Sequence, residues 1–205
     1  MKLFLVRHGE TAWNKLGRFQ GQEDTPLNPR GRAQARETAI ASVAWQATAL
    51  YSSPLCRTLE TAQEISRLVG LPVVPQEGLK ELALGELEGV TGEEMRRGWP
   101  QVYQTWRNDP GAVVMPGGES LGRLQERAWQ VVSELEQAHG EDDVLVLVSH
   151  NFALRAIVAK VLGMPLANFH SMSLALGSIG VIESDARGRR LVTYNSTSHL
   201  SLENR

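Results

Sequence analysis

Apolar and polar residues are mixed along most of this chain, but three short segments are almost wholly apolar. They are Lys2–Val6, Ala49–Ser52 and Val144–Val148. Short, continuous apolar runs are typical of central strands that are covered on both faces, as in a parallel sheet. The sequence therefore predicts a buried sheet whose strands are largely parallel.

Helical patterns lie between and after these runs. Residues 29–45 place scattered apolar side chains among Arg, Gln and Glu, and residues 55–69 form a second predicted helix. We expect Ser52-Ser53-Pro54 to cap and start that second helix, and Gly70 to end it. From about Ser120, apolar residues recur at three- and four-residue steps, as on the buried face of a long helix.

The remaining patterns complete an α/β arrangement with helices on both faces of the sheet. Residues 152–162 predict another helix, and the runs 181–182 and 191–194 predict a terminal hairpin. Residues 91–116 predict a small, mostly helical insertion that starts at the capping-box pattern Thr91…Glu94. Its aromatic residues are expected either to cover a pocket or to form the insertion's own core, and they are Trp99, Tyr103 and Trp106.

Composition narrows the class of protein. The 205 residues, 42% of them hydrophobic, suit one domain spanning 1–205. A net charge of −2 supplies no basic field, so we expect neither nucleic acid nor a membrane as a partner. The single cysteine, Cys56, excludes an internal disulfide and suits the cytoplasm, and the run Leu3–Val6 is too short to span a membrane. Whether the chain forms a homodimer is left open.

Basic side chains follow the predicted strands at their carboxyl ends. Arg7 and His8 follow the first strand, Arg57 comes soon after the second, and His150 follows the third of the runs. Open parallel sheets bind ligands beyond the carboxyl ends of their strands, so neighbouring strands would bring these four side chains into one pocket. Guanidinium groups near a free helix N-terminus favour an anion such as phosphate.

These residue types suit phosphoryl transfer. An imidazole with a pKa of about 6.5 is a competent nucleophile near neutral pH, and arginine forks stabilise the charge of a transferring phosphoryl group. Glu81, on a glycine-punctuated loop, is the candidate proton donor for the leaving oxygen. Each residue alone has an ordinary explanation, such as an Arg57–Glu60 pair along one helix, but their joint placement favours a site.

The run Leu5–Asn14, with Arg7-His8-Gly9 at its centre, resembles the signature of the histidine phosphatase superfamily, the phosphoglycerate-mutase-like proteins. Further motifs agree with that family in order and spacing, from residue 2 to about 163. They are Tyr51–Thr58 for the second arginine, Glu81…Gly85…Glu88-Gly89 for the acid, and Val148–His150 for the second histidine.

The resemblance implies a fold and a set of roles. The fold is a three-layer α/β/α sandwich with a mostly parallel sheet and a small helical cap insertion, residues 91–116, over the pocket. His8 would be the phosphorylated nucleophile and Glu81 the proton donor. The other catalytic residues would complete the phosphate pocket, and they are Arg7, Arg57 and His150. Residues that would line its substrate side are Asn14, Gln20, Gly21 and Asn151, the last standing where the family commonly has glycine.

We therefore expect a phosphoric monoester hydrolase of the histidine acid phosphatase type, which needs no metal or cofactor and acts on a small phosphate ester. A phosphoglycerate mutase and a phospho-ligand binding or regulatory protein are the alternatives. The intact catalytic positions argue against a binding or regulatory protein. Gln20 stands where mutases usually show a small hydroxyl residue, which argues against a mutase.

The sequence does not identify the ester. Gly117–Leu121 and Asn195…His199 look like segments of metal-independent phosphoserine phosphatases, which would bring His199 towards the substrate. A histidine in such a polar C-terminal run is more often simply solvated. Leu84 is apolar where a polar residue could bind a carboxylate, so strict specificity for an amino-acid phosphate is not supported.

Overall fold

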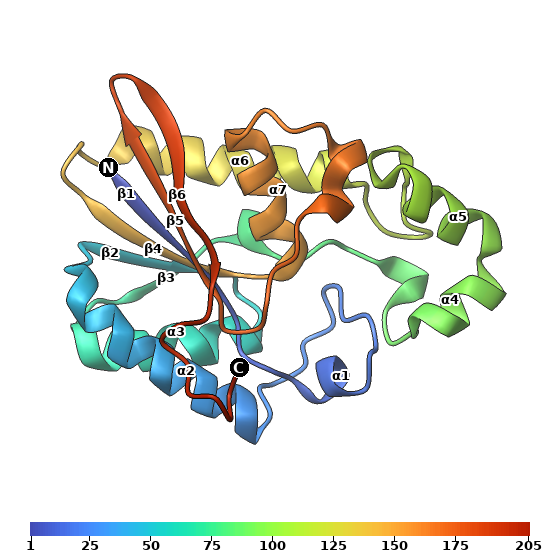
Figure 1. The fold of residues 1–205 in the computed structure, drawn as a ribbon, viewed down its shortest axis with the longest axis horizontal. Coiled ribbons are helices and arrows are strands. Elements are labelled where there is room, and N and C mark those ends of the chain that lie inside the picture. The colour runs from blue at the N-terminus through green and yellow to red at the C-terminus, as the bar shows by residue number, and fades with distance from the viewer.

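The sheet lies at the centre of the molecule, between two layers of helices (Figure 1). The computed structural model describes residues 1–205, and six strands run in the order β3-β2-β4-β1-β5-β6. The strands are β1 (Lys2–Arg7), β2 (Ala49–Ser52), β3 (Val73–Pro75), β4 (Val144–Ser149), β5 (Ile179–Asp185) and β6 (Gly188–Ser196). Neighbours from β3 to β1 are parallel, whereas β5 is antiparallel to β1 and β6. The predicted sheet and terminal hairpin are confirmed.

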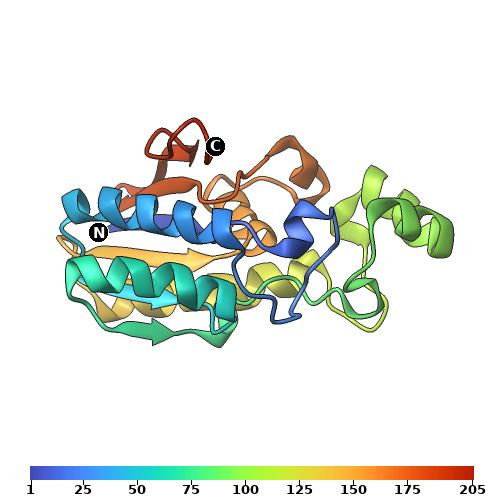
Figure 2. The same ribbon diagram turned by 90° about the horizontal axis from the view of Figure 1, so that it is seen from below.

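Four long helices cover the sheet. Figures 1 and 2 show one pair on each face, α2 (Pro29–Ser42) and α3 (Cys56–Val69) opposite α6 (Leu121–Ala138) and α7 (Asn151–Val161). Three short helices lie beyond the carboxyl ends of the strands, and they are α1 (Ala12–Lys15), α4 (Gly92–Gly98) and α5 (Pro100–Asn108). The expected α/β/α sandwich is therefore confirmed. No helix has the length and apolar character needed to cross a membrane.

The apolar run of β4 contributes side chains to two hydrophobic cores, one on each face of the sheet. Leu145 and Leu147 pack with side chains of α6 and α7, whereas Val146 and Val148 pack with side chains of α2 and α3. Successive side chains of a strand point to opposite faces, so a strand covered on both sides must be apolar at every position. This is why β4 shows no alternation with polar residues.

The expected cap of α3 is wrong, although the helix starts within one residue of the expected position. The helix begins at Cys56, and Ser52-Ser53-Pro54 does not cap it. Instead, the Asp24 carboxylate accepts from the Cys56 amide (2.6 Å), and the Ser53 hydroxyl lies 2.8 Å from His150 Nε2. The cap thus comes from a residue 32 positions earlier, which local sequence patterns do not reveal.

Other expected helix ends are close to those observed. Ser120 caps α6, and the Thr91…Glu94 capping box starts α4. The predicted helix over residues 29–45 is observed as α2 followed by a short 3₁₀ helix, Val43–Trp45. The 3₁₀ helix ends where Gln46 adopts a left-handed conformation (φ 54°).

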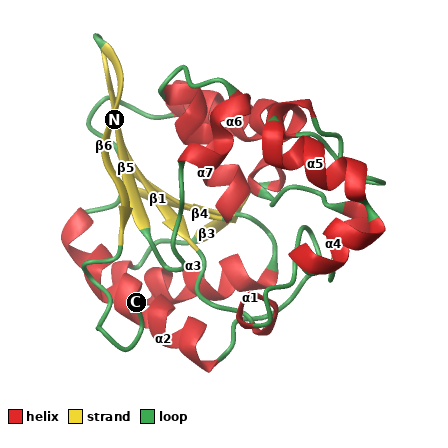
Figure 3. Ribbon diagram, turned by 45° about the vertical axis from the view of Figure 1, so that its right-hand side comes forward, coloured by secondary structure: helices red, strands yellow, loops and turns green.

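The C-terminal tail returns to helix α2 (Figure 3). Its backbone and side chains hydrogen-bond to Gln34 and Glu37, and His199 Nε2 lies 3.1 Å from the Thr38 hydroxyl. His199 is half-buried against α2 and is not among the residues that line the pocket described below. The expectation that it approaches a substrate is wrong.

The topology creates one site at the sheet's edge. The chain leaves β1 towards α2 and leaves the adjacent β4 towards α7, on the opposite face. Arg7 is paired with Ser149 across these strands, so His8 and His150 leave the sheet side by side, with ring centroids 5.2 Å apart. Such reversals of winding direction are where open parallel sheets bind ligands.

Candidate active site

A cavity of about 170 Å³ lies at this reversal point. Eight of the nine residues expected in the site line it, and they are Arg7, His8, Asn14, Gln20, Gly21, Arg57, Glu81 and Asn151. The ninth, His150, is fully buried beside Arg57. The lining also holds Leu84, as its expected position near the substrate implies, and three residues that the sequence did not single out, which are Arg18, Phe19 and Phe152.

His8 is held as a neutral imidazole with one free nitrogen. Its Nδ1 lies 2.7 Å from the carbonyl oxygen of Gly9. Because a carbonyl only accepts hydrogen bonds, Nδ1 carries the proton and Nε2 keeps its lone pair. Burial, followed by the charges of Arg57 and Arg7, lowers the pKa of His8 well below its usual 6.5. The ring is therefore unprotonated at neutral pH, as a nucleophilic imidazole must be.

The glycine after His8 is needed for close packing. A Cβ atom on Gly9 would lie 2.3 Å from the carbonyl oxygen of Gly31, in the first turn of α2. Only glycine lets the chain pass this close to the helix. The same residue supplies the carbonyl that fixes the His8 ring, so the His-Gly pair has a direct structural cause.

Two arginines present unused donors to the cavity. Arg57 is fully buried, and it donates to the carbonyl oxygens of Gly21 (2.7 Å) and Glu23 (2.7 Å) and to His150 Nδ1 (3.2 Å). A guanidinium has five N–H groups, so two remain for a ligand. Arg7 donates to the carbonyl of Leu174, but its buried Nε has no partner. Although burial lowers the pKa of Arg7 to about 10, it stays charged at neutral pH.

His150 supports the arginine instead of carrying a charge of its own. Because Nδ1 accepts from Arg57, Nε2 must hold the proton and donate to the Ser53 hydroxyl (2.8 Å). Burial, then the neighbouring Arg57, lowers the pKa of His150 well below its usual 6.5. In the pocket as described, this histidine is neutral.

Glu81 sits at the N-terminus of α7. One carboxyl oxygen accepts from the amides of Leu82 (3.0 Å), Phe152 (3.0 Å) and Ala153 (3.2 Å). These amides and the two arginines lower its pKa, but burial outweighs them and the net direction is upward from the usual 4.5. Glu81 therefore keeps a proton to higher pH than an exposed glutamate, as a general acid requires.

Two amide side chains complete the polar wall. The Gln20 Oε1 atom accepts from the hydroxyls of Thr11 (2.8 Å) and Thr25, which leaves its NH₂ group free to donate. Asn14 Oδ1 likewise accepts from the Thr11 amide (3.1 Å). Both NH₂ groups are thus available to an anion in the cavity.

The other wall is apolar. Phe19, Leu84 and Phe152 also line a second, apolar hollow with Met95, Trp106, Leu87 and Met115. No residue of 91–116 lines the cavity itself. Trp99, Tyr103 and Trp106 pack on an apolar cluster beside the cavity that the insertion shares with the main domain, so they do not form a core of the insertion's own. Arg18, at the rim, joins the cavity to the insertion through Glu94 (3.6 Å).

The side chains at the site form neither a metal-ion site nor a reactive thiolate that could take the place of the histidine. No group of three or more histidine, cysteine, aspartate or glutamate side chains is placed to hold a metal ion. Burial and Asp24 raise the pKa of the Cys56 thiol to about 12, so it is not a thiolate at neutral pH. The pocket therefore combines a neutral imidazole, two cationic forks and a carboxyl group of raised pKa around one small volume, which suits transfer of a phosphoryl group.

Comparisons with known proteins point the same way. The sequence model of the histidine phosphatase superfamily (branch 1) matches residues 3–197. The chain is 35% identical to phosphoserine phosphatase 1 of Hydrogenobacter thermophilus, covering 98% of this chain and 94% of that protein. It is 34% identical to a probable phosphoglycerate mutase, GpmB, of Salmonella paratyphi C, over 98% and 95% of the two chains. The native structure of mycobacterial glucosyl-3-phosphoglycerate phosphatase superposes with a TM-score of 0.87 at 30% identity, covering 96% and 99% of the chains.

Proposed function

The chain belongs to branch 1 of the histidine phosphatase superfamily, and from that premise we propose that it hydrolyses small phosphate monoesters through a phosphoryl group carried on His8. It is a phosphatase, and its mechanism is that of the histidine acid phosphatase type. One observation carries the proposal. The neutral His8 imidazole, with its Nε2 lone pair free, lines a cavity to which two arginines present unused N–H donors.

The first half-reaction forms the phosphoenzyme. Arg7 and Arg57 bind the phosphate oxygens while His8 Nε2 attacks phosphorus and the P–O bond to the alcohol breaks. Glu81 gives its proton to the departing oxygen, so the alcohol leaves neutral and Glu81 becomes a carboxylate. His150 acts in this step by keeping the Arg57 fork in place.

The second half-reaction restores the enzyme. The Glu81 carboxylate takes a proton from a water molecule as the water oxygen attacks phosphorus. The P–N bond to His8 then breaks, and inorganic phosphate leaves. Charge on the phosphoryl group is met by arginines throughout, so no step requires a metal ion.

We propose a range of small esters as substrates, not phosphoserine alone. Beyond the phosphate, the cavity offers the apolar side chains Phe19, Leu84 and Phe152 and, at the rim, Arg18. None of the three apolar groups can form an ion pair with an ammonium group or accept a hydrogen bond from it in the way a carboxylate would. Asn14, Gln20, Gly21 and Asn151 are proposed to contact the phosphate side. A screen of phosphorylated metabolites ranked by kcat/KM tests this range.

Further proposals concern the setting of the enzyme. The net charge of −2 supports a small-molecule partner and no nucleic acid. The free Cys56 supports a cytoplasmic location. We propose one domain over residues 1–205, with residues 91–116 as a cap at the rim of the cavity, and leave open whether two copies associate.

The function is tested by asking where the phosphoryl group goes. With 3-phosphoglycerate and a catalytic amount of 2,3-bisphosphoglycerate, we expect free phosphate to accumulate while 2-phosphoglycerate forms slowly or not at all. A mutase must keep its phosphohistidine away from water while the intermediate reorients. Several other esters should also release phosphate, and a chelator should leave these rates unchanged. Fast isomerisation with little phosphate would favour the mutase.

Glu81→Gln should slow hydrolysis in proportion to how much the leaving group needs a proton. We expect a loss of roughly hundredfold or more for an alkyl phosphate, the usual effect of removing a general acid. An aryl phosphate with an acidic phenol leaves without help and should lose much less. The measurement is kcat/KM for both esters on one enzyme preparation, because kcat/KM reports the first half-reaction and not the hydrolysis of the phosphoenzyme that all esters share. Equal losses would mean that Glu81 serves only to bind or to fold.

The pH dependence should reflect the two shifted groups. His8 must be unprotonated, and its lowered pKa means that activity is lost only when the pH falls well below 6.5. Glu81 must be protonated, and its raised pKa means that activity with an alkyl ester is lost as the pH rises through that value. We expect Glu81→Gln to remove the alkaline limb alone. The profile of kcat/KM, corrected for ionisation of the ester, checks this, and a histidine inflection near 6.5 would contradict it.

A further inference from the structure

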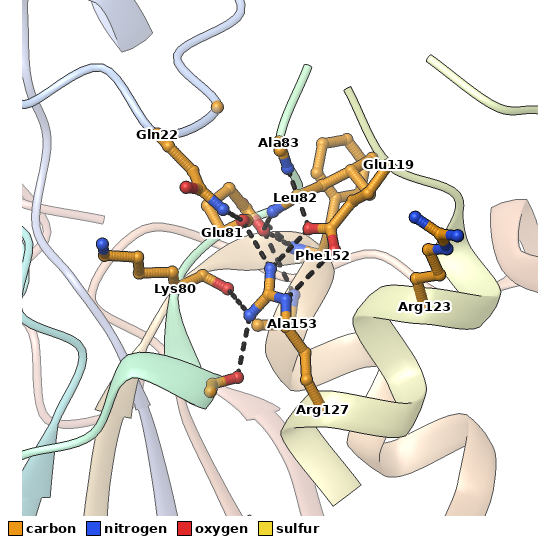
Figure 4. Close-up of polar contacts among 12 residues, drawn as sticks. Gln22, Lys80, Glu81, Leu82, Ala83, Glu119, Arg123, Arg127, Phe152 and Ala153 are labelled. Atoms are coloured by element: carbon orange, nitrogen blue, oxygen red, sulfur yellow. Dashed lines mark hydrogen bonds and ion pairs between the residues drawn. The ribbon is translucent and has the colours of Figure 1, made fainter. Parts of the chain in front are cut away.

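One ion pair outside the cavity hydrogen-bonds to the loop that carries Glu81. Arg127, on helix α6, points at this loop and pairs with Glu119, which precedes the helix (Figure 4). Neither residue lines the cavity, and no step of the proposed reaction uses them. Their contacts nevertheless fall on both sides of the proton donor.

Arg127 uses every donor it has. Its Nη1 donates to the carbonyl oxygens of Gly78 (2.8 Å) and Lys80 (2.7 Å), and its Nη2 donates to the carbonyl of Glu81 (2.7 Å). The other two N–H groups bind the Glu119 carboxylate, at 3.1 Å from Nε and 2.5 Å from Nη2. A guanidinium with all five N–H groups engaged fixes the relative positions of its acceptors.

Glu119 holds the residues after Glu81. Its carboxylate accepts from the Ala83 amide (2.9 Å), and its own amide donates to the Ala83 carbonyl (2.9 Å). The chains touch so closely here that a Cβ on Gly118 would lie 2.2 Å from the Ala83 carbonyl oxygen. The Gly-Gly-Glu segment therefore has a structural task, which is to pin the far side of the loop.

The position of the Glu81 carboxyl group depends on this backbone. It reaches the amides of Phe152 and Ala153 only while residues 80–83 stay where they are. Gln22 adds one donor to the Glu81 carbonyl (3.0 Å), but Arg127 and Glu119 make the remaining side-chain contacts to that backbone. A small displacement of a proton donor is enough to cost it much of its effect.

We propose that Arg127 and Glu119 are positioning residues, which hold the Glu81 loop so that its carboxyl group stays aligned with the leaving oxygen. The proposal rests on the acid role given to Glu81 in the proposed function. It predicts a defect in proton donation, with phosphate binding and attack by His8 left intact.

The test is the leaving-group dependence of Arg127→Lys and Glu119→Gln. Each variant should lose at least tenfold in kcat/KM on an alkyl phosphate but less than about threefold on an aryl phosphate with an acidic phenol, because kcat/KM reports the first half-reaction alone. Arg123→Met is the matched control, because Arg123 lies on the same helix, is exposed and has no drawn contact with the loop (Figure 4). It should behave as the unchanged enzyme on both esters.

A double-variant comparison separates positioning from stability. If Arg127 acts through Glu81, adding Arg127→Lys to Glu81→Gln should change the remaining alkyl rate by less than about twofold. The alkyl-to-aryl ratio is measured on one preparation, so it does not depend on the fraction of folded enzyme. Equal losses on both esters, or an additive loss in the double variant, would overturn the proposal.

The outcomes also separate this inference from the proposed function. If Glu81→Gln shows no leaving-group dependence, the acid role itself is wrong, and the positioning role is overturned with it. If Glu81→Gln discriminates between the esters but Arg127→Lys and Glu119→Gln do not, the proposed function stands and only the positioning role is overturned.

Discussion

Replacing His8 with alanine is expected to abolish turnover, with kcat falling by roughly 10⁴-fold or more, the scale seen when a covalent nucleophile is removed. The reason lies in the ring's surroundings. Nδ1 is committed to the Gly9 carbonyl, so the lone pair on Nε2 is the reactive one, and burial together with two adjacent arginines lowers the pKa of the ring and keeps it neutral. The variant loses the only group that the site presents as a nucleophile.

The measurement is rapid quenching with labelled substrate. The unchanged enzyme should trap a phosphoenzyme that is labile in acid and stable in base, and His8→Ala should trap none. His170→Ala is the matched control, because that histidine is exposed and hydrogen-bonds only to the Trp106 carbonyl (2.7 Å). A label that is stable in acid, or turnover that survives in His8→Ala, would contradict the mechanism.

Competing nucleophiles near His8 are disfavoured by their own contacts. The Ser53 hydroxyl is fully buried, accepts from His150 Nε2 and does not line the cavity. The Cys56 thiol has a pKa raised to about 12 by burial and by Asp24. Neither can present an anionic oxygen or sulfur to phosphorus at neutral pH. Phosphorylation of His8 is therefore the expected first event.

The sheet was predictable because its signal is local. A strand such as β4 must be apolar at every position when helices cover both faces of the sheet. A run of consecutive apolar residues in the sequence therefore indicates such a strand. The site followed from the sheet, because His8 and His150 come directly after neighbouring parallel strands. The positions of the strand ends, and the rule that parallel sheets bind ligands beyond those ends, were enough to predict that these side chains lie together.

The features that the sequence did not reveal depend on contacts between distant segments. Asp24 caps α3 from 32 residues away, which frees Ser53 to hold His150. Phe152 lies two residues after the second histidine, yet its place in the cavity depends on how α7 is oriented. Arg127 hydrogen-bonds to Glu81, which lies 46 residues earlier in the chain, and no periodic pattern in the sequence indicates this contact. Such pairings are fixed by the folded state and not by neighbours in the chain.

Arg57→Met should lower kcat/KM by roughly 10³-fold or more, the scale reported for an arginine that stabilises a transferring phosphoryl group. The loss has two parts. The two N–H groups left for a ligand disappear, and three acceptors lose their donor: the buried Gly21 carbonyl and His150 Nδ1, and the part-buried Glu23 carbonyl. Each of the two buried acceptors, left unsatisfied, costs about 1–3 kcal/mol of folding stability.

Arg57→Lys separates the two parts, because it keeps the positive charge but cannot donate in a planar fork. We expect it to recover little of the lost rate. Arg67→Met is the matched control on the same helix α3, where an exposed side chain pairs only with Glu64, and its rate should stay within about twofold of the unchanged enzyme. Inhibition by inorganic phosphate should weaken in both Arg57 variants and not in Arg67→Met, since Arg57 lines the cavity and Arg67 does not. Full activity in Arg57→Lys would mean that charge alone, without the fork, serves the phosphoryl group.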